Sequence, residues 1–300
     1  MKFPAKKEAV KGELFILSEA LLWSFFPIIS ILTFSSLDPL YTAGLSTLTA
    51  AFFFAVVLTW RKRWHEVLRR DAWRDILYTT LIIGVLFYVL VFLGIQRTTA
   101  GNSSIIAQME VFFSFVILGS LLKKEKMSFQ HKLGAFLMVV GALLVLFQGS
   151  FQLNEGDAIL LVAMILPPLG NYFAQRARKK VESYTIMFIR SLIAGIFILF
   201  LALIFAPIPG PIEIQNSFVF LLINGILLMG LSKFFWLEGI HRIFISKAIS
   251  LNAVTPFFTL VFAYFILGEV PKIWQLLGLI PLVIGILILS EFRSKNWRGK

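Results

Sequence analysis

Long runs of apolar residues, separated by short charged or Pro- and Gly-containing stretches, make up most of the chain. A helix that crosses the hydrocarbon layer needs about 20 apolar residues, at a rise of about 1.5 Å each. The apolar residues are consecutive and do not alternate with polar ones, which excludes barrel strands. The pattern predicts ten membrane-spanning helices. Their expected bounds are 14–33, 39–60, 75–95, 101–122, 132–149, 156–174, 184–206, 217–237, 246–267 and 272–290.

The composition supports an all-α integral membrane protein. The chain is 58% hydrophobic and 15% charged, with a mean hydropathy of +0.86, and a soluble core cannot absorb that much apolar surface. The first apolar run is too long for a signal peptide and lacks a small-residue cleavage site, so we expect a retained first helix. The chain has no cysteine, which excludes disulfides and Cys-based metal sites.

The net charge of +12 is distributed as a topology signal rather than as a nucleic-acid surface. One set of alternate loops and both ends carry most of the basic residues, and the opposite loops carry little besides Arg97 and Lys272. By the positive-inside rule, both termini are expected to be cytoplasmic, in the inner or plasma membrane. The basic set is Lys2, Lys6, Lys7, Lys11, Arg61, Lys62, Arg63, Arg69, Arg70, Arg74, Lys123, Lys124, Lys126, Lys132, Arg176, Arg178, Lys179, Lys180, Arg242, Arg293, Lys295, Arg298 and Lys300.

The two halves of the chain match each other at a nearly constant spacing. Gly12-Glu13 matches Gly156-Asp157, Gly94-Ile95-Gln96-Arg97 matches Gly239-Ile240-His241-Arg242, Phe112-Phe113 matches Phe257-Phe258, Glu125 matches Glu269, Gly134 matches Gly278, and Gly141 matches Gly285. We expect two five-helix units, at 12–150 and 154–292. Because five is odd, the second unit must be inverted relative to the first, which is a frequent plan of secondary carriers.

The second half resembles the EamA family of the drug/metabolite transporter superfamily. The resemblance rests on Gly239-Ile-His-Arg, Pro256-Phe-Phe-Thr-Leu, Leu267-Gly268-Glu269, Gly278 and Gly285, and on Arg190 after Glu182-Ser183-Tyr184. The first half departs from the family pattern, with Ser46 at the position equivalent to Arg190 and Val111 in place of Pro256. The resemblance spans about residues 12–291 and implies two inverted repeats, with a central cavity formed by spans 1, 3, 4, 6, 8 and 9. The family's substrates include amino acids, other metabolites, nucleotide-linked sugars and drugs.

Ionisable residues inside the spans are the first functional candidates, because each costs several kcal/mol in hydrocarbon unless it is paired or hydrated. Glu110 lies about 13 Å into the fourth span, near the midplane. Ser103, Glu110 and Ser114 form one polar stripe on that helix, and Asn252, Thr255 and Thr259 form the equivalent stripe in the other half. We expect these stripes to bind substrate, with Glu110 receiving a cationic group or a coupled proton. A protonated Glu110 that is hydrogen-bonded within the bundle is the structural alternative.

Three further ionisable residues lie inside the spans, at depths similar to one another: Glu19, Lys233 and Arg190. An ion pair between Glu19 and Lys233 would close the cytoplasmic side and act as a gate. Arg190 competes as the partner of Glu19, although its helix is more peripheral and favours a structural role. Lys233 could instead extend to the membrane interface.

Prolines and aromatic residues add to the expected site. Pro27, Pro256 and the pair Pro167-Pro168, which lies near Asn171, are expected to break their spans beside a site or hinge. Trp23 and Tyr88 are expected to face the cavity and stack on an organic substrate. The paired glycines of the fifth and tenth spans are expected to allow close helix packing. The segment from Arg61 to Arg74 is expected to form an amphipathic surface helix on anionic lipid.

The sequence favours a transporter of small molecules in the lipid bilayer. The first interpretation is a secondary carrier, a permease that exports small metabolites (amino acids or related compounds) or drugs by alternating access. The second is a flippase for a lipid-linked substrate. A membrane-embedded enzyme is the third, and it lacks support because His131 and His241 fall in predicted loops and His65 in the surface segment. With no P-loop, metal-ligand spacing or G-x-S-x-G motif, no cofactor, metal or catalytic residue is expected. The sequence leaves open the substrate, the direction of transport, the coupling ion and whether the chain forms a homodimer.

Overall fold

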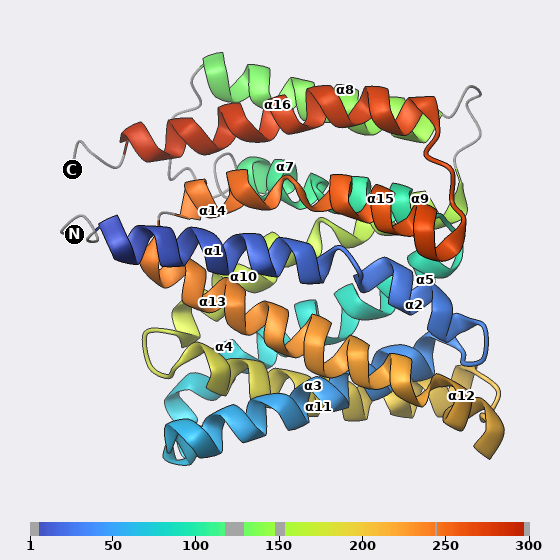
Figure 1. Cartoon of the computed structure of the whole chain (residues 1–300). Helices are drawn as coiled ribbons and strands as arrows, with labels where there is room; N and C mark the ends of the chain where they lie inside the picture. Colours follow the sequence, from blue (N-terminus) through green and yellow to red (C-terminus); the bar gives the residue numbers. More distant parts are fainter. Residues whose placement is uncertain (1–5, 118–128, 148–153, 244, 297–300) are drawn as a thin grey trace.

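The computed structural model describes residues 6–117, 129–147, 154–243 and 245–296, and within these ranges every regular element is a helix (Figure 1). The elements are α1 (Lys6–Trp23), α2 (Phe26–Phe34), α3 (Pro39–Arg61), η1 (Trp64–Leu68), α4 (Arg70–Thr79), η2 (Thr80–Phe87), α5 (Tyr88–Gln96), α6 (Ala100–Ala107), α7 (Met109–Phe115), α8 (Phe129–Phe147), α9 (Glu155–Ala163), α10 (Leu166–Ala177), α11 (Ser183–Phe205), α12 (Pro211–Leu222), η4 (Ile223–Leu231), α13 (Ser232–Arg242), α14 (Ile245–Asn252), α15 (Thr255–Leu267) and α16 (Ile273–Asn296).

Among the described residues, 7 helical segments are long and apolar enough to cross a membrane. They are Glu8–Phe34, Pro39–Arg61, Arg70–Gln96, Glu155–Ala177, Ser183–Phe205, Pro211–Arg242 and Lys247–Leu267. Two of the other predicted spans form shorter apolar helices, Lys132–Leu146 and Ile273–Leu289. The span predicted at 101–122 begins as α6 and α7, and its last residues lie outside the described part of the chain.

Local sequence signals set several helix ends. Asp38 caps α3 by accepting a hydrogen bond from the Leu40 amide, and Thr99 caps α6 in the same way through the Asn102 amide. Gly268 ends α15 at φ 69°, where a residue without a Cβ carries no steric penalty. Lys62 ends α3 at φ 53° and is the one non-glycine residue of the described chain with a positive φ.

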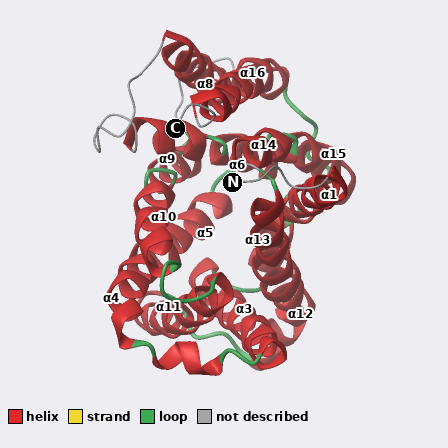
Figure 2. Cartoon of the chain, turned by 90° about the vertical axis from the view of Figure 1, so that its left-hand side faces the viewer, coloured by secondary structure: helices red, strands yellow, loops and turns green. Residues whose placement is uncertain are grey.

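The helices pack in four groups. α3 lies along α11, and α8 lies along α16. α1 packs against α13 and α14, whereas α5 packs against α9, and α4 packs against α10. Figure 2, viewed from the end at which α1 begins, shows α8 with α16 at the top and α3 with α11 at the bottom. The group containing α1 and α13 lies on one side, and the group containing α5 and α10 lies on the other.

Glycines bring the paired helices into close contact. A Cβ on Gly141 would lie 2.6 Å from the carbonyl oxygen of Gly278, so the predicted close packing of these glycines is confirmed. The α1–α13 and α5–α9 crossings repeat one arrangement. A Cβ on Gly239 would lie 3.3 Å from the Gly12 carbonyl oxygen, and a Cβ on Gly94 would lie 3.2 Å from that of Gly156.

Helix irregularities fall in selected segments. α2, α10 and α15 each begin after a break and carry proline in their first turn, which confirms the breaks predicted at Pro27, Pro167 and Pro256. The break between α6 and α7 at Gln108 has no proline. η2 and η4 are π-helical, a feature frequent at functional sites that the sequence did not predict. The long helices α3, α8, α11 and α16 run without such breaks.

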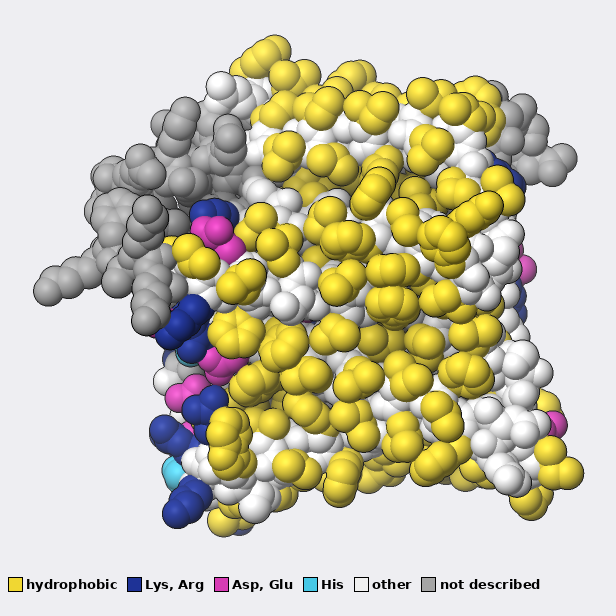
Figure 3. All heavy atoms as spheres, in the orientation of Figure 1, with side chains coloured by type: hydrophobic (Ala, Val, Ile, Leu, Met, Phe, Trp, Pro, Cys, Tyr) yellow, Lys and Arg dark blue, Asp and Glu magenta, His cyan; other side chains and the backbone are white. Residues whose placement is uncertain are grey.

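The face of the molecule seen in Figure 3 has an apolar belt with charges at its margins. Lys, Arg, Asp and Glu side chains gather along the edge at which α1 begins and α16 ends. The prediction of one surface helix from Arg61 to Arg74, at this edge, is wrong. The segment contains the short helix η1 and then the start of α4, and α4 begins the apolar segment Arg70–Gln96. Asp75, which is buried, holds α4 in this position by pairing with Arg176 of α10 at 3.2 Å.

Candidate substrate-binding site

A chain of polar contacts joins α1, α13, α14 and α15 inside the bundle. The Glu19 carboxylate, fully buried, accepts from Lys233 Nζ at 2.8 Å and from Asn252 Nδ2 at 2.7 Å. Thr255 Oγ1 in turn donates to Asn252 Oδ1 at 2.5 Å. Thr259 Oγ1 donates to the Ser24 carbonyl at 3.0 Å, where the break between α1 and α2 begins. These contacts give the two oxygens of Glu19 one charged and one neutral donor.

Aromatic rings cover this network. Lys233 Nζ lies 3.3 Å from the ring centroid of Trp23, and Trp23 stacks on Phe26 at 4.4 Å. Phe26 meets Phe92 edge-on at 5.4 Å, and the Tyr88 ring lies 6.5 Å from Phe92. Trp23 and Tyr88, both predicted from the sequence, are therefore opposite ends of one aromatic row.

Glu110 lies on α7, across from α10. Asn171 Nδ2 donates to Glu110 Oε1 at 3.5 Å. Glu110 is half-buried, and Asn171 is exposed. Ser114 lies one turn further along α7, and no hydrogen bond within the described chain connects it to this network.

The Glu19–Lys233 contact lies between two helices that pack against each other. α1 and α13 meet at the Gly12–Gly239 crossing, so this ion pair does not bridge the two sides of the bundle. Arg190 is not the partner of Glu19, because Lys233 and Asn252 take up its two oxygens. The gating role predicted for the pair remains a prediction.

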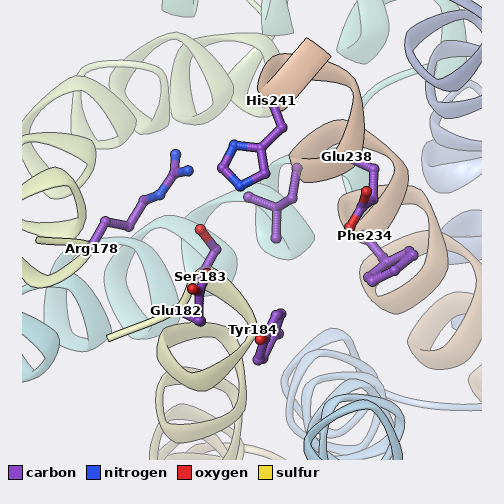
Figure 4. Close-up of a pocket in the computed structure, with 8 residues that line it drawn as sticks. Arg178, Glu182, Ser183, Tyr184, Phe234, Glu238 and His241 are labelled. Carbon is purple, nitrogen blue, oxygen red and sulfur yellow. The ribbon is translucent and has the colours of Figure 1, made fainter. Parts of the chain in front are cut away.

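A pocket lies at the end of the molecule at which α1 begins, near the Gly12–Gly239 crossing. Figure 4 shows side chains that line it. Arg178 and Ser183 line it from the α10–α11 side, and Phe234, Leu237 and His241 line it from α13. Arg178 and His241 point toward each other across it. His241 therefore belongs to the last turn of α13 and lines a pocket, so its predicted place in a loop is wrong. The pocket lies between the two sides of the bundle.

Comparison with known proteins shows which family the chain belongs to. The model of the EamA-like transporter family matches residues 10–147 and again residues 154–291. The chain belongs to the EamA-like transporter family. With its apolar helices, this makes it a multi-pass membrane transporter.

Curated relatives of this EamA-like transporter carry the same general description. An uncharacterized transporter of Methanothermobacter thermautotrophicus is 25% identical over 239 residues, 78% of this chain and 67% of the relative. An uncharacterized transporter of Archaeoglobus fulgidus is 24% identical over 287 residues, 93% of this chain and 97% of the relative. A solved crystal structure with 13% identity matches with a TM-score of 0.70, over 95% of this chain and 98% of that one, and supports the fold alone.

A second polar network, which the sequence did not predict, connects helices at the opposite end of this EamA-like transporter. The buried Asp157 carboxylate of α9 accepts hydrogen bonds from Thr98 and, at 2.9 Å, from Asn102 Nδ2. Gln275 Nε2 of α16 donates to Asn102 Oδ1 at 2.7 Å, and Glu269 accepts from the Ala100 amide at 3.1 Å. Asp157 is near the start of a predicted span. Its match to Glu13 in the internal repeat is the sequence feature that could have marked it as a candidate.

Proposed function

We propose that this protein is a secondary carrier that exports a small polar or amphipathic metabolite, or a drug, by alternating access. The observation that carries the proposal is the position of the polar residues. Polar residues face each other from the two sides of the bundle: Glu110 and Asn171 on one side, and Glu19, Lys233 and Asn252 on the other. The pocket lies toward one end of the molecule from them, and the closed hydrogen-bond network of Gln275 lies toward the opposite end.

An inverted duplication would explain the repeated geometry. The equivalent pairs Gly12–Gly239 and Gly156–Gly94 make nearly the same approach at opposite ends of the molecule. η2 and η4 occupy equivalent places in the two halves, and one family model matches both halves. These facts support ten spans in two inverted five-helix repeats, 12–150 and 154–292. Such repeats can exchange conformations at little cost, which is the basis of alternating access.

The proposed state is inward-facing. The basic residues favour a cytoplasmic location for the end with the pocket and for both termini. At the other end, Gln275 and Glu269 join the loop and helix after α15 to α6, so this side is closed. Export would require these contacts to separate while the walls of the pocket, α13 and the α10–α11 turn, approach each other.

Each predicted site residue has a role in this proposal. Glu110, with Asn171 as its hydrogen-bond donor, receives a cationic group or a proton, and Ser114 adds a hydroxyl one turn further along α7. Asn252, Thr255 and Thr259 supply hydrogen bonds, and Trp23 and Tyr88 stack on the organic part of the substrate. Glu19 holds Lys233 over Trp23; a gating role would need α1 and α13 to separate, which their close crossing opposes.

Transport by the purified chain in liposomes tests the proposal. A pool of amino acids, nucleobases, sugars and cationic drugs is offered with and without a pH gradient. We expect saturable uptake that Glu110→Gln abolishes and that Glu155→Gln, at a side chain 76% exposed, leaves intact. Equal uptake by the Glu110→Gln protein refutes the role of Glu110. No uptake by folded protein would favour the lipid-linked flippase instead.

A further inference from the structure

Arg190 of α11 is a buried cation for which the described residues supply no anionic partner. Its side chain belongs to a residue only 7% exposed, its Nε has no hydrogen-bond partner, and none of the ion pairs formed by the described residues includes it. The Tyr88 ring lies close to it, with its centroid 5.8 Å from the guanidinium carbon. Because a guanidinium stays protonated in proteins, this is a permanent positive charge in a spanning segment.

Lys233, which is half-buried, shows how the same fold treats a second cation inside the bundle. Both cations lie against the aromatic row, Lys233 against Trp23 and Arg190 against Tyr88. Lys233 is neutralised by Glu19 at 2.8 Å. No carboxylate in the described part of the chain pairs with Arg190, and Glu19 is already engaged by two donors. One end of the aromatic row is therefore electrically compensated and the other end is not.

Arg190 lies on the same helix, α11, as part of the pocket lining. Ser183 lines the pocket, and a residue seven positions later lies on nearly the same helix face, about 10 Å deeper. The facing π-helical segment carries Gly84, where a Cβ would lie 3.1 Å from Arg190 Cγ. The absence of a side chain at this position gives the arginine stem room to lie across η2, with its head toward Tyr88 one turn further on.

We propose that Arg190 and Tyr88 form a subsite for an anionic group, a carboxylate or a phosphate, of the transported molecule. The inference rests on the proposed function, because the bound group would belong to the transported molecule, and it narrows the substrate to organic anions or zwitterions. A guanidinium offers paired N–H donors in the planar geometry that both groups accept. A buried charge that lacks a partner gains most from such a ligand. Tyr88 holds the guanidinium in place by a cation–π contact.

Anion binding to the full-length protein, purified in detergent, tests the subsite without any transport measurement. The thermal unfolding midpoint is followed against sodium acetate and sodium phosphate, with sodium chloride at matched ionic strength as the baseline. We expect a saturable rise of about 3 °C or more with at least one of the two anions. The anion with the lower half-saturating concentration identifies carboxylate or phosphate as the preferred group.

Three variants decide the assignment. Arg190→Gln should remove the anion-dependent rise, and Arg190→Lys, which keeps the charge and loses the planar fork, should raise the half-saturating concentration at least tenfold. Arg97→Gln, at an exposed arginine, should respond as the wild type does. If Arg190→Gln does not fold, the Arg190→Lys comparison decides alone.

A wild-type protein that shows no rise overturns the subsite, and so does an Arg190 variant that responds as the wild type does. Failure of uptake in liposomes, with the anion response intact, would instead overturn the transport proposal and leave the anion site standing.

Discussion

The buried Glu19–Lys233 pair gives the sharpest test of the energetics, because its two partners differ in environment. The Glu19 side chain is 1% exposed and the Lys233 side chain is 19% exposed. Lys233→Met leaves the carboxylate buried with Asn252 as its remaining donor, and breaking a buried pair from one side costs about 3–5 kcal/mol.

Glu19→Gln should cost less. The glutamine keeps an acceptor for Asn252, while Lys233 keeps the Trp23 ring and some access to water, so we expect a loss of about 1–2 kcal/mol. The double variant removes both charges. It should therefore be more stable than the sum of the single losses predicts, by about 2 kcal/mol.

Equilibrium unfolding of the purified protein in mixed micelles, followed by circular dichroism, measures the four free energies of this cycle. The exposed pair Lys11–Glu8 supplies the control: Lys11→Met should change the free energy of unfolding by less than about 0.5 kcal/mol. Equal costs for Lys233→Met and Glu19→Gln, or strictly additive costs in the double variant, would refute the asymmetric burial on which this reasoning depends.

Three other outcomes are expected. Gly141→Ala puts a Cβ 2.6 Å from the backbone of the facing helix and should destabilise the fold by about 1–3 kcal/mol, whereas Gly210→Ala, with its nearest neighbour at 3.7 Å, should be nearly neutral; equal unfolding midpoints would contradict the close crossing. Asp157→Asn should cost about 1–3 kcal/mol in the same unfolding assay, because it weakens a buried charge-assisted acceptor of two side-chain donors; an unchanged free energy would speak against the network. In right-side-out vesicles of this cysteine-free chain, an impermeant maleimide should label Gln96→Cys and not His65→Cys, and the reverse pattern would invert the proposed orientation.

The apolar runs of the sequence were enough to predict the helices, and the prolines were enough to predict breaks in three of the spans. Apolar length predicts helices whatever their neighbours are, and a proline disrupts the helix around it through its own ring. The breaks before α2, α10 and α15 follow from that local chemistry. The break at Gln108 and the π-helical segments could not be read in this way, because packing between helices determines where a continuous apolar run adopts an irregular turn.

In the site, too, some features follow from the sequence and others depend on how the helices pack. The depth of Glu19, Lys233 and Glu110 in their spans could be counted from the sequence, since a helix advances by a constant rise. Depth alone could not choose between Lys233 and Arg190 as the partner of Glu19. That choice depends on which helix lies beside α1, and the Gly12–Gly239 crossing selects α13.

By itself, then, the sequence determined that this chain is a helical membrane protein built from two similar halves, and which charged residues lie deep within it. Only the tertiary structure decided which of those charges are neutralised. Glu19 and Lys233 compensate each other, and Asp157 joins the network at the far end. Arg190 lies beside Tyr88 and forms no ion pair with any other described residue. The physical reason is range: helix formation depends on neighbours along the chain, whereas the energy of a buried charge depends on atoms within a few ångströms, which distant segments supply.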